Sequence, residues 1–339
     1  MTRPIALVLG ATGGIGGHVA QVLQQRGWHV RGLHRDPAAA RTRRPDARID
    51  WVAGDAMNAA DVAAAARGAA VIVHAVNPPG YKDWDRLVLP MLDHTIAAAR
   101  AEGARIVWPG TVYNHGPDAF PLLTEVSPEH PATRKGTIRV EMEARLRRAA
   151  ATGVRSLVVR AGDFFGPQPG NGWFAQALVK PGQPVTAVAN PGEPGVGHAW
   201  AYMPDVAETM VRLLEREADL APFDTFHMAG HWDPDGQAMT ASIARVVGRP
   251  DLPVRRVPWW LFTLASPFVT VFREMREMRY LWQQPVRLDN TKLATFLGAE
   301  PHTPIDDAVR HTLQALGCLA PEAGAAASTL RYTTGSDRR

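Results

Sequence analysis

Along most of the first 230 residues, short apolar runs alternate with longer segments whose apolar residues recur with helical periodicity. The run Ile5–Leu9 is apolar throughout, which is typical of a strand buried on both faces. A helical pattern over residues 18–26 follows and ends at Gly27. The same order then repeats. Strands are expected at 28–33, 48–53, 71–75, 106–108, 155–160 and 225–229, and helices at 59–67, 84–101, 136–151 and 206–216.

This alternation predicts the α/β class, with a Rossmann-type doubly wound parallel sheet. The pattern breaks into Pro- and Gly-rich chain over residues 168–198, and helical pieces dominate after Gly230. We therefore expect a Rossmann domain of residues 1–167, completed by 199–229. A smaller, mostly helical C-terminal lobe is expected from 168–198 and 230–319. Residues 320–339 are small and polar and are expected to form a disordered tail.

The turn after the first apolar run has the glycine spacing of a dinucleotide-binding loop, with Gly10, Gly13 and Gly16. One glycine permits the tight turn, one lets the main chain approach a diphosphate, and one lets helix pack closely on strand. The helix start presents unpaired N–H groups and a positive dipole end to the phosphates. Because the motif follows a strand and opens a helix, it predicts dinucleotide binding. The alternative is a glycine-rich turn that binds nothing.

The end of the second expected strand carries His34 and Arg35. At this position an acidic residue hydrogen-bonds the ribose 2′-hydroxyl of NAD, whereas an arginine accommodates the 2′-phosphate of NADP. Arg35 could pair with that phosphate through two hydrogen bonds, and Arg41, Arg43 and Arg44 stand close behind it. We therefore favour NADP, with NAD left open because Asp36 is adjacent. The alternative is a solvated basic loop.

Composition narrows the classes of protein further. The content of 46% hydrophobic and 21% charged residues is that of a globular protein. The single cysteine, Cys318, excludes an internal disulfide framework, and no basic-then-apolar leader precedes the first strand, so a cytoplasmic location is expected. The longest apolar stretch, 259–272, is shorter than the roughly 20 residues that span a bilayer, so stable membrane insertion is not expected.

The net charge of +4 comes from arginines spread along the chain, without a basic patch interleaved with aromatic residues. Nucleic acid is therefore not an expected partner. No Cys/His spacing suggests a metal site. A small-molecule substrate is expected, and a homodimer is compatible with the sequence.

Five landmarks stand in order along the chain: the turn 10–16, Gly54-Asp55, Val112-Tyr113, the segment 160–167 and the segment 202–207. In these landmarks the chain resembles an extended, atypical short-chain dehydrogenase/reductase of the NAD-dependent epimerase/dehydratase family, over about residues 4–318. The resemblance implies a nicotinamide cofactor and a substrate-binding lobe. The expected cofactor-binding residues are Gly10, Thr12, Gly13, Gly14, Ile15, Gly16, His34, Arg35, Asp55, Ala56, Ala75, Val76, Asn77, Lys135, Gly162 and Asp163.

The catalytic signature departs from that family, which uses a Tyr-x-x-x-Lys pair on the helix after strand five and a Ser or Thr at that strand's end. Here Lys135 falls in the tyrosine place, Arg139 in the lysine place and the usual serine position near Pro109. The catalytic candidates are therefore Tyr113, Thr111 and Lys135. We expect Tyr113 to be a proton donor or a wall of the site, and Lys135 to be an acid/base or a clamp on the cofactor ribose.

Further acid/base candidates are His115 and Asp163, each of which could instead be a loop residue or a neighbour of the cofactor. Two functions stay open from the sequence. The first is an NAD(P)-dependent reductase or epimerase-like enzyme for a small organic carbonyl compound, supported by the retained lobe. The second is an NADP-binding redox-sensing or regulatory protein without turnover, supported by the missing tyrosine.

Overall fold

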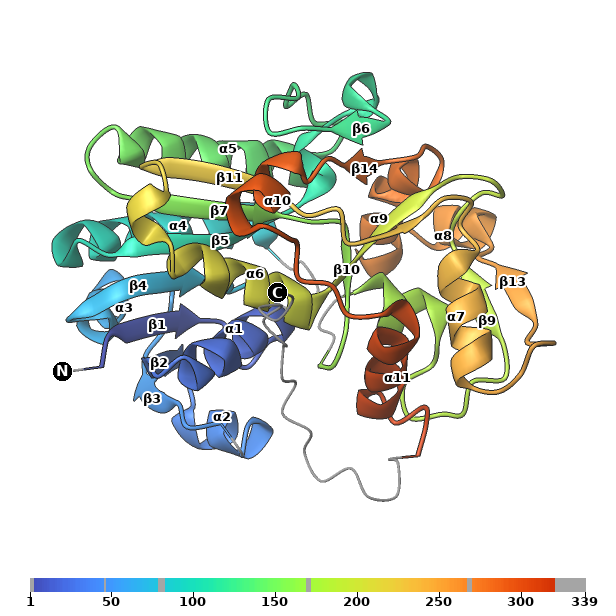
Figure 1. The fold of residues 1–339 in the computed structure, drawn as a ribbon, viewed down its shortest axis with the longest axis horizontal. Helices are drawn as coiled ribbons and strands as arrows, with labels where there is room; N and C mark the ends of the chain where they lie inside the picture. Colours follow the sequence, from blue (N-terminus) through green and yellow to red (C-terminus); the bar gives the residue numbers. More distant parts are fainter. Residues whose placement is uncertain (1–2, 46, 79–82, 169–171, 267–269, 321–339) are drawn as a thin grey trace, which may run out of the picture.

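The computed structural model describes residues 3–45, 47–78, 83–168, 172–266 and 270–320 (Figure 1). Its centre is a seven-stranded sheet in the order β11-β7-β5-β4-β1-β2-β3, with every neighbouring pair parallel. The order reverses between β1 and β4, where dinucleotides bind in sheets of this kind. The strands are β1 (Ile5–Leu9), β2 (His29–His34), β3 (Asp50–Ala53), β4 (Ala69–His74), β5 (Arg105–Gly110), β7 (Ser156–Arg160) and β11 (Phe223–His227).

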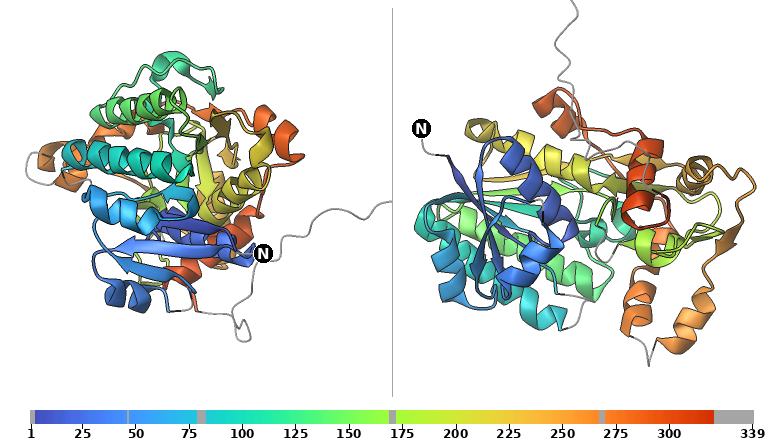
Figure 2. Two further views of the ribbon diagram at one scale, coloured as in Figure 1. Left: turned by 90° about the vertical axis from the view of Figure 1, so that its left-hand side faces the viewer. Right: turned by 90° about the horizontal axis from the view of Figure 1, so that it is seen from below.

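Helices cover both faces of this sheet (Figure 2). One layer holds α1 (Gly14–Gln25), α2 (Pro37–Arg43) and α6 (Met203–Leu214), and the other holds α3 (Ala59–Ala66), α4 (Trp84–Glu102) and α5 (Arg134–Ala150). Strand β1 shows why its sequence is continuously apolar. Val8 packs in the core beneath the first layer, and Leu7 and Leu9 pack in the core beneath the second. The predicted doubly wound parallel sheet is confirmed.

Two local predictions need correction. Helix α1 begins at Gly14 rather than at residue 18, because Gly14, Gly16 and Gly17 are helical although they carry no hydrophobic pattern. The segment after β2, read in one alternative as a solvated loop, is instead helix α2. Asp36 caps it by accepting a hydrogen bond from the Ala39 amide at 3.0 Å, and Pro37 begins its first turn.

The remainder of the chain forms a lobe at the carboxyl ends of the central strands (Figure 1). It has short strands as well as helices, and β10, which falls within residues 199–229, pairs with β8 and β12 rather than with the central sheet. The strands are β6 (Leu122–Leu123), β8 (Asp163–Phe165), β9 (Val188–Asn190), β10 (His198–Tyr202), β12 (His231–Asp233), β13 (Val254–Arg256) and β14 (Arg287–Leu288). The lobe helices are α7 (Ala238–Val246), α8 (Trp259–Ala265), α9 (Thr270–Glu277) and α11 (Ile305–Ala315). Helix α10 (Thr291–Leu297) instead packs on the central sheet, where Leu293 is buried in the core of the first layer and the Phe296 ring contacts Phe226 of β11.

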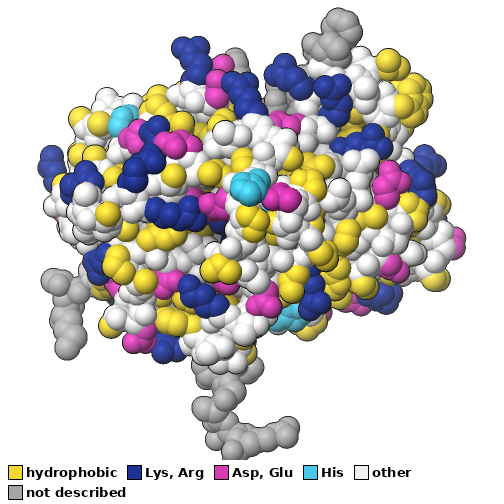
Figure 3. All heavy atoms as spheres, turned by 90° about the horizontal axis from the view of Figure 1, so that it is seen from above, with side chains coloured by type: hydrophobic (Ala, Val, Ile, Leu, Met, Phe, Trp, Pro, Cys, Tyr) yellow, Lys and Arg dark blue, Asp and Glu magenta, His cyan; other side chains and the backbone are white. Residues whose placement is uncertain are grey.

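The lobe has its own aromatic core, in which Trp173, Trp200 and Trp282 are buried together with Phe165 and Phe174. Among the described residues, no helix has the length and apolar character to cross a membrane. On the face shown in Figure 3, basic side chains are scattered among acidic and apolar ones. The tail expected to be disordered lies outside the described residues from position 321 onward.

Candidate cofactor and active site

The glycine turn joins the carboxyl end of β1 to α1 at the reversal point of the sheet. Gly10 has a φ of +89°, and a Cβ there would lie 2.5 Å from the Ala75 carbonyl oxygen. A Cβ on Gly16 would lie 2.4 Å from the Gly10 carbonyl oxygen. Only glycine fits either position without moving main chain, so strand, turn and helix pack closely enough to present their main-chain atoms to a ligand.

The start of α1 has no side-chain cap. Gly13, at the N-cap, provides no side chain to cap the helix, and the first turn contains no acidic residue. The first amides of the helix therefore keep their hydrogen-bonding capacity for an anion. These residues fit a dinucleotide, whose diphosphate would be held by the main chain around Gly13, Gly14 and Ile15, with Thr12 half-buried beside them.

The residues expected near the adenosine lie at the ends of β2 and β3. Arg35 is exposed, whereas the Asp36 carboxylate is used by α2 and the Asp36 amide donates to His34 Nδ1 at 3.0 Å. Asp55 accepts a hydrogen bond from the Met57 amide at 2.9 Å. Because Asp36 is already engaged, Arg35 is the charged side chain at the end of β2 that remains available to the cofactor.

The residues after β4 come next along the sheet edge. Ala75 and Val76 are half-buried, and the Ala75 amide donates to the Leu9 carbonyl oxygen at 3.0 Å. Asn77 accepts a hydrogen bond from Trp84 Nε1 at 2.6 Å. Ala56, after β3, is also half-buried, and its carbonyl oxygen accepts from a histidine ring at 3.0 Å.

Gly162 and Asp163 have local partners in the lobe. A Cβ on Gly162 would lie 2.2 Å from the Ala199 carbonyl oxygen, so this glycine permits the close approach of β8 to β10. Asp163 Oδ2 is 2.9 Å from His198 Nε2, and the His198 ring stacks on Trp282 with 3.7 Å between centroids. No pattern in the sequence predicted this buried carboxylate–imidazole pair.

Thr111 and Tyr113 follow β5 and adjoin the start of α5. Thr111 is buried, and its hydroxyl oxygen has no hydrogen-bond partner within the described part of the chain. Tyr113 is half-buried in the short 3-10 helix Val112–Asn114. Its carbonyl oxygen lies 2.2 Å from where a Cβ on Gly136 would be, so this segment packs on the first turn of α5. The structure thus brings Tyr113 to the helix turn that carries Lys135.

Lys135 is 4% exposed and has a counter-ion from the lobe. Its Nζ is 3.7 Å from Glu277 Oε2, and its main-chain amide donates to Glu277 Oε1 at 3.2 Å. Nearby, the Tyr280 hydroxyl donates to the His115 carbonyl oxygen at 3.5 Å. Burial raises the pKa of Tyr280, and Asp163 and Glu277 raise it further. The sequence analysis did not identify Glu277 or Tyr280 as site residues. A buried lysine needs a carboxylate partner, but this requirement alone does not say which carboxylate it is.

Arg139, in the place of the family lysine, lies against aromatic rings. Its guanidinium carbon is 5.3 Å from the Trp84 ring and 5.0 Å from the Trp108 ring, and Nη1 donates to the Pro109 carbonyl oxygen at 3.3 Å. A guanidinium in this setting is a cation–π partner rather than a group that loses its proton. It supplies positive charge to this edge of the sheet.

A buried ionic network lies behind the site. Arg160 is 2% exposed and donates to both carboxylate oxygens of Glu143, which is fully buried, at 2.9 and 2.8 Å. His115 Nδ1 is 2.9 Å from the Pro128 carbonyl oxygen. Burial, with a further contribution from Arg160, lowers the pKa of His115 to about 4. This lowered pKa favours the neutral imidazole, whose one N–H then faces the Pro128 carbonyl oxygen, so His115 is poorly suited to act as an acid at pH 7.

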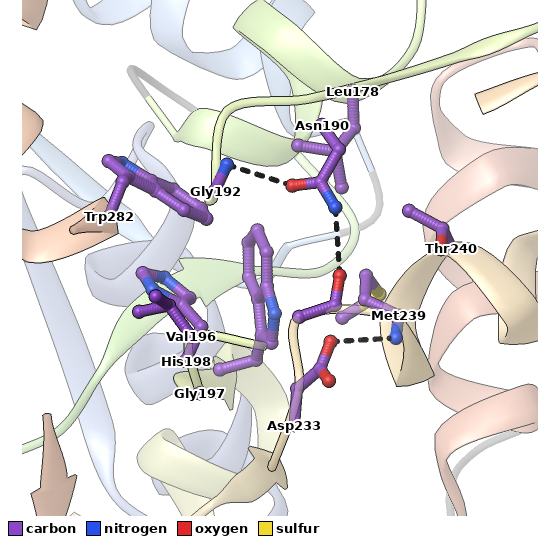
Figure 4. A pocket seen from close by; sticks show the side chains of 12 residues that line it. Leu178, Asn190, Gly192, Val196, Gly197, His198, Asp233, Met239, Thr240 and Trp282 are labelled. Carbon is purple, nitrogen blue, oxygen red and sulfur yellow. Dashed lines mark hydrogen bonds between the residues drawn. The ribbon is translucent and has the colours of Figure 1, made fainter. Parts of the chain in front are cut away.

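A small pocket within the lobe is lined by apolar side chains and by polar groups that hydrogen-bond one another (Figure 4). Asn190 accepts from the Gly192 amide at 2.9 Å and donates to the Gly236 carbonyl oxygen at 2.8 Å. Asp233 accepts from the Met239 amide at 3.1 Å, at the start of α7. These bonds hold loops of the lobe together. In the part of the chain that the structure describes, no group of three or more His, Cys, Asp or Glu residues could hold a metal ion.

Residues 10–164 match the family model described as NAD(P)H-binding. A curated relative, a 3-diazoavenalumate denitrifying reductase from a Streptomyces species, is 33% identical over 181 residues, which cover 48% of this chain and 57% of the relative. The chain therefore spans a little over half the length of the curated relative it matches.

Solved structures with the same fold cover nearly the whole chain. The UDP-glucose 4-epimerase from Brucella ovis in complex with NAD matches with a TM-score of 0.72 and 16% identity, over 93% of this chain and 99% of that one. The UDP-glucuronic acid 4-epimerase from Bacillus cereus in complex with NAD matches with a TM-score of 0.71 and 16% identity, over 92% and 98%. Residues 10–164 thus match an NAD(P)H-binding domain, and the chain has the fold of these NAD-bound UDP-sugar 4-epimerases.

Proposed function

We propose that this chain is an NADP(H)-dependent reductase of a small organic carbonyl compound. One observation supports the proposal most directly. The same sheet edge carries the glycine turn, whose helix α1 has no side-chain cap, and the buried Lys135, which is paired with Glu277. The reductase name of the curated relative supports the reaction type. When bound, NADPH would supply a hydride. The residues of this chain bind the cofactor and donate a proton to the reduced substrate.

For cofactor choice, we propose that Arg35 recognises the 2′-phosphate. The side chain is exposed at the end of β2, and the adjacent acidic residue, Asp36, caps α2. An arginine fork can make two charge-assisted hydrogen bonds to a phosphate. NAD lacks this phosphate, so the same contact favours NADP.

For the chemistry, we propose that Lys135 donates the proton. Hydride addition to a carbonyl carbon breaks the C=O π bond and leaves an alkoxide, which must take up a proton. The Lys135 ammonium group replaces the family tyrosine as that donor, and Glu277 holds it in position through their 3.7 Å ion pair. The Thr111 hydroxyl, which has no partner among the described residues, is available to hydrogen-bond the substrate oxygen. Tyr113 is the competing donor.

A second acceptor class is favoured by the missing tyrosine. The relative's name indicates a substrate that carries a diazo group and is reduced with loss of nitrogen. When a hydride reaches an aryl diazonium carbon, the C–N bond breaks, dinitrogen leaves and a C–H bond forms. No alkoxide arises, so no proton donor is required. The helix α5 (Arg134–Ala150), which contains no tyrosine, suits such an acceptor.

The test is turnover by the full chain with NADPH and a panel of ketones, aldehydes, enones and stabilised aryl diazonium salts. NADPH fluorescence reports oxidation, and mass spectrometry identifies the reduced product. We expect one class to consume NADPH in step with product. Tight NADPH binding without oxidation across the panel would instead support the regulatory alternative.

A further inference from the structure

Arg44 is a buried arginine whose partners are all neutral. It is 8% exposed, Nη2 donates to the Gly17 carbonyl oxygen at 2.9 Å, and Nη1 donates to the Gln168 side-chain oxygen. Two other buried arginines, Arg105 and Arg160, each have a carboxylate partner. Within the described residues Arg44 has none. Burying a positive charge without a counter-ion costs free energy. A site with such an unpaired positive charge is therefore suited to bind an anion.

The guanidinium lies over the first turns of α1. A Cβ on Gly17 would come within 2.5 Å of Arg44 Nη1, so the helix must have glycine there for the arginine to approach. Three residues earlier, a Cβ on Gly14 would lie 3.0 Å from the Gln168 carbonyl oxygen. Arg44 and Gln168 therefore bridge the stretch Gly14–Gly17, beside the amides that fit a diphosphate.

Gln168 is held in an unfavourable main-chain conformation. Its φ is +57°, in the left-handed region that residues other than glycine rarely adopt. The segment before it is fixed on α1, because His18 Nε2 is 2.9 Å from the Pro167 carbonyl oxygen. The side chain is exposed apart from its bond to Arg44. This strained, exposed glutamine therefore presents its amide oxygen to the buried Arg44 guanidinium beside the glycine turn.

We propose that Arg44 is a ligand for the diphosphate of the dinucleotide, and that the Gln168 amide oxygen occupies the position of a phosphate oxygen until the cofactor displaces it. A phosphate oxygen bears a charge and the amide oxygen does not, so the exchange gives Arg44 the counter-ion it lacks. The inference rests on the proposed binding of a nicotinamide dinucleotide, and it does not depend on turnover.

The test measures the affinity of the purified full chain for NADPH and NADH by calorimetry. Arg44→Gln is expected to weaken both cofactors by about tenfold to a hundredfold, since charge-assisted hydrogen bonds have that worth and both cofactors contain the diphosphate. Gln168→Ala is expected to tighten both by about twofold to tenfold, since it removes a competing neutral bond. If the Arg44–Gln168 hydrogen bond only stabilised the fold, the two substitutions would not change cofactor affinity in opposite directions.

Arg105→Gln is the matched control. Arg105 is 1% exposed, pairs with Glu217 at 3.3 Å and lies at the amino end of β5, away from the glycine turn. The variant is expected to lower the melting temperature and leave both affinities unchanged. Should Arg44→Gln fail to fold, Gln168→Ala decides the question alone, because its side chain is exposed.

Unchanged affinities in either Arg44→Gln or Gln168→Ala would overturn the inference, as would a loss confined to NADPH, which would assign Arg44 to the 2′-phosphate. Failure of the proposed function is separate. A native chain that binds neither cofactor would refute the dinucleotide site itself. A chain that binds NADPH but reduces nothing would leave the Arg44 assignment standing.

Discussion

The glycine turn after β1 and the edge where β5 meets α5 both adjoin the carboxyl ends of the central strands, yet they are built from different atoms. The first is formed by main chain, in which Gly10 and Gly16 allow contacts that no side chain would permit. The second is a candidate site made by side chains, in which Lys135 of α5 is paired with Glu277 of α9. A main-chain site tolerates little change, whereas a side-chain site can acquire new chemistry through a few substitutions.

The largest effect is expected from Gly16→Ala. The added Cβ would lie 2.4 Å from the Gly10 carbonyl oxygen, so the turn must move away from the geometry that fits a diphosphate. We expect NADPH affinity to fall beyond detection by calorimetry. Gly27→Ala is the control, because Gly27 has a φ of +82° and nothing within 4 Å of an added Cβ. It is expected to cost about 1 kcal/mol of stability and leave affinity unchanged. Normal NADPH affinity in Gly16→Ala would mean that the turn does not hold the cofactor.

The next effect concerns the side-chain site. Lys135→Met is expected to lower kcat for a carbonyl substrate by about a hundredfold or more, the usual worth of a positioned acid, with NADPH affinity little changed. Tyr113→Phe is the matched comparison and is expected to stay active. An active Lys135→Met with an inactive Tyr113→Phe would transfer the proton role to the tyrosine. With a diazonium substrate, both variants are expected to turn over at the native rate.

These two sites also differ in how far the sequence predicts them. The central strands and the glycine turn were predictable because their signals are local: a continuous apolar run, glycine spacing and a following helix. Helix α2 was missed because its seven residues are too few to show a period, although Asp36 and Pro37 are ordinary start signals. The site pairs Lys135–Glu277 and Asp163–His198 were not predictable, since each joins segments far apart in the chain without a motif.

A smaller effect is expected from Arg35→Ala, which tests the cofactor preference of the main-chain site. Loss of the exposed guanidinium should weaken NADPH by about tenfold and leave NADH nearly unchanged, because only NADPH carries the 2′-phosphate. Calorimetry with each cofactor gives the ratio directly. Equal losses for both would contradict the proposed phosphate contact and would reopen NAD as the natural cofactor.

The smallest effect links the two regions through acid stability. His18, in the helix that follows the glycine turn, and His115, in the segment that follows β5, are both buried, and burial lowers the pKa of each to about 4. Below the usual histidine pKa of about 6.5, these two histidines bind protons in the unfolded chain but stay neutral in the folded chain. Stability is therefore lost as pH falls from about 6.5 towards 4, and each histidine contributes about 1.4 kcal/mol of loss by about pH 5.5.

Urea unfolding between about pH 7.5 and 5.5 measures this loss. His18→Gln and His115→Gln each remove one titrating group, so each is expected to reduce the pH-dependent loss by about 1.4 kcal/mol while lowering stability at neutral pH. His130→Gln is the control, since that ring is exposed. If either buried-site variant kept the native dependence, its histidine would be protonated in the folded chain. At position 115 this would restore His115 as a candidate acid and weaken the case for Lys135.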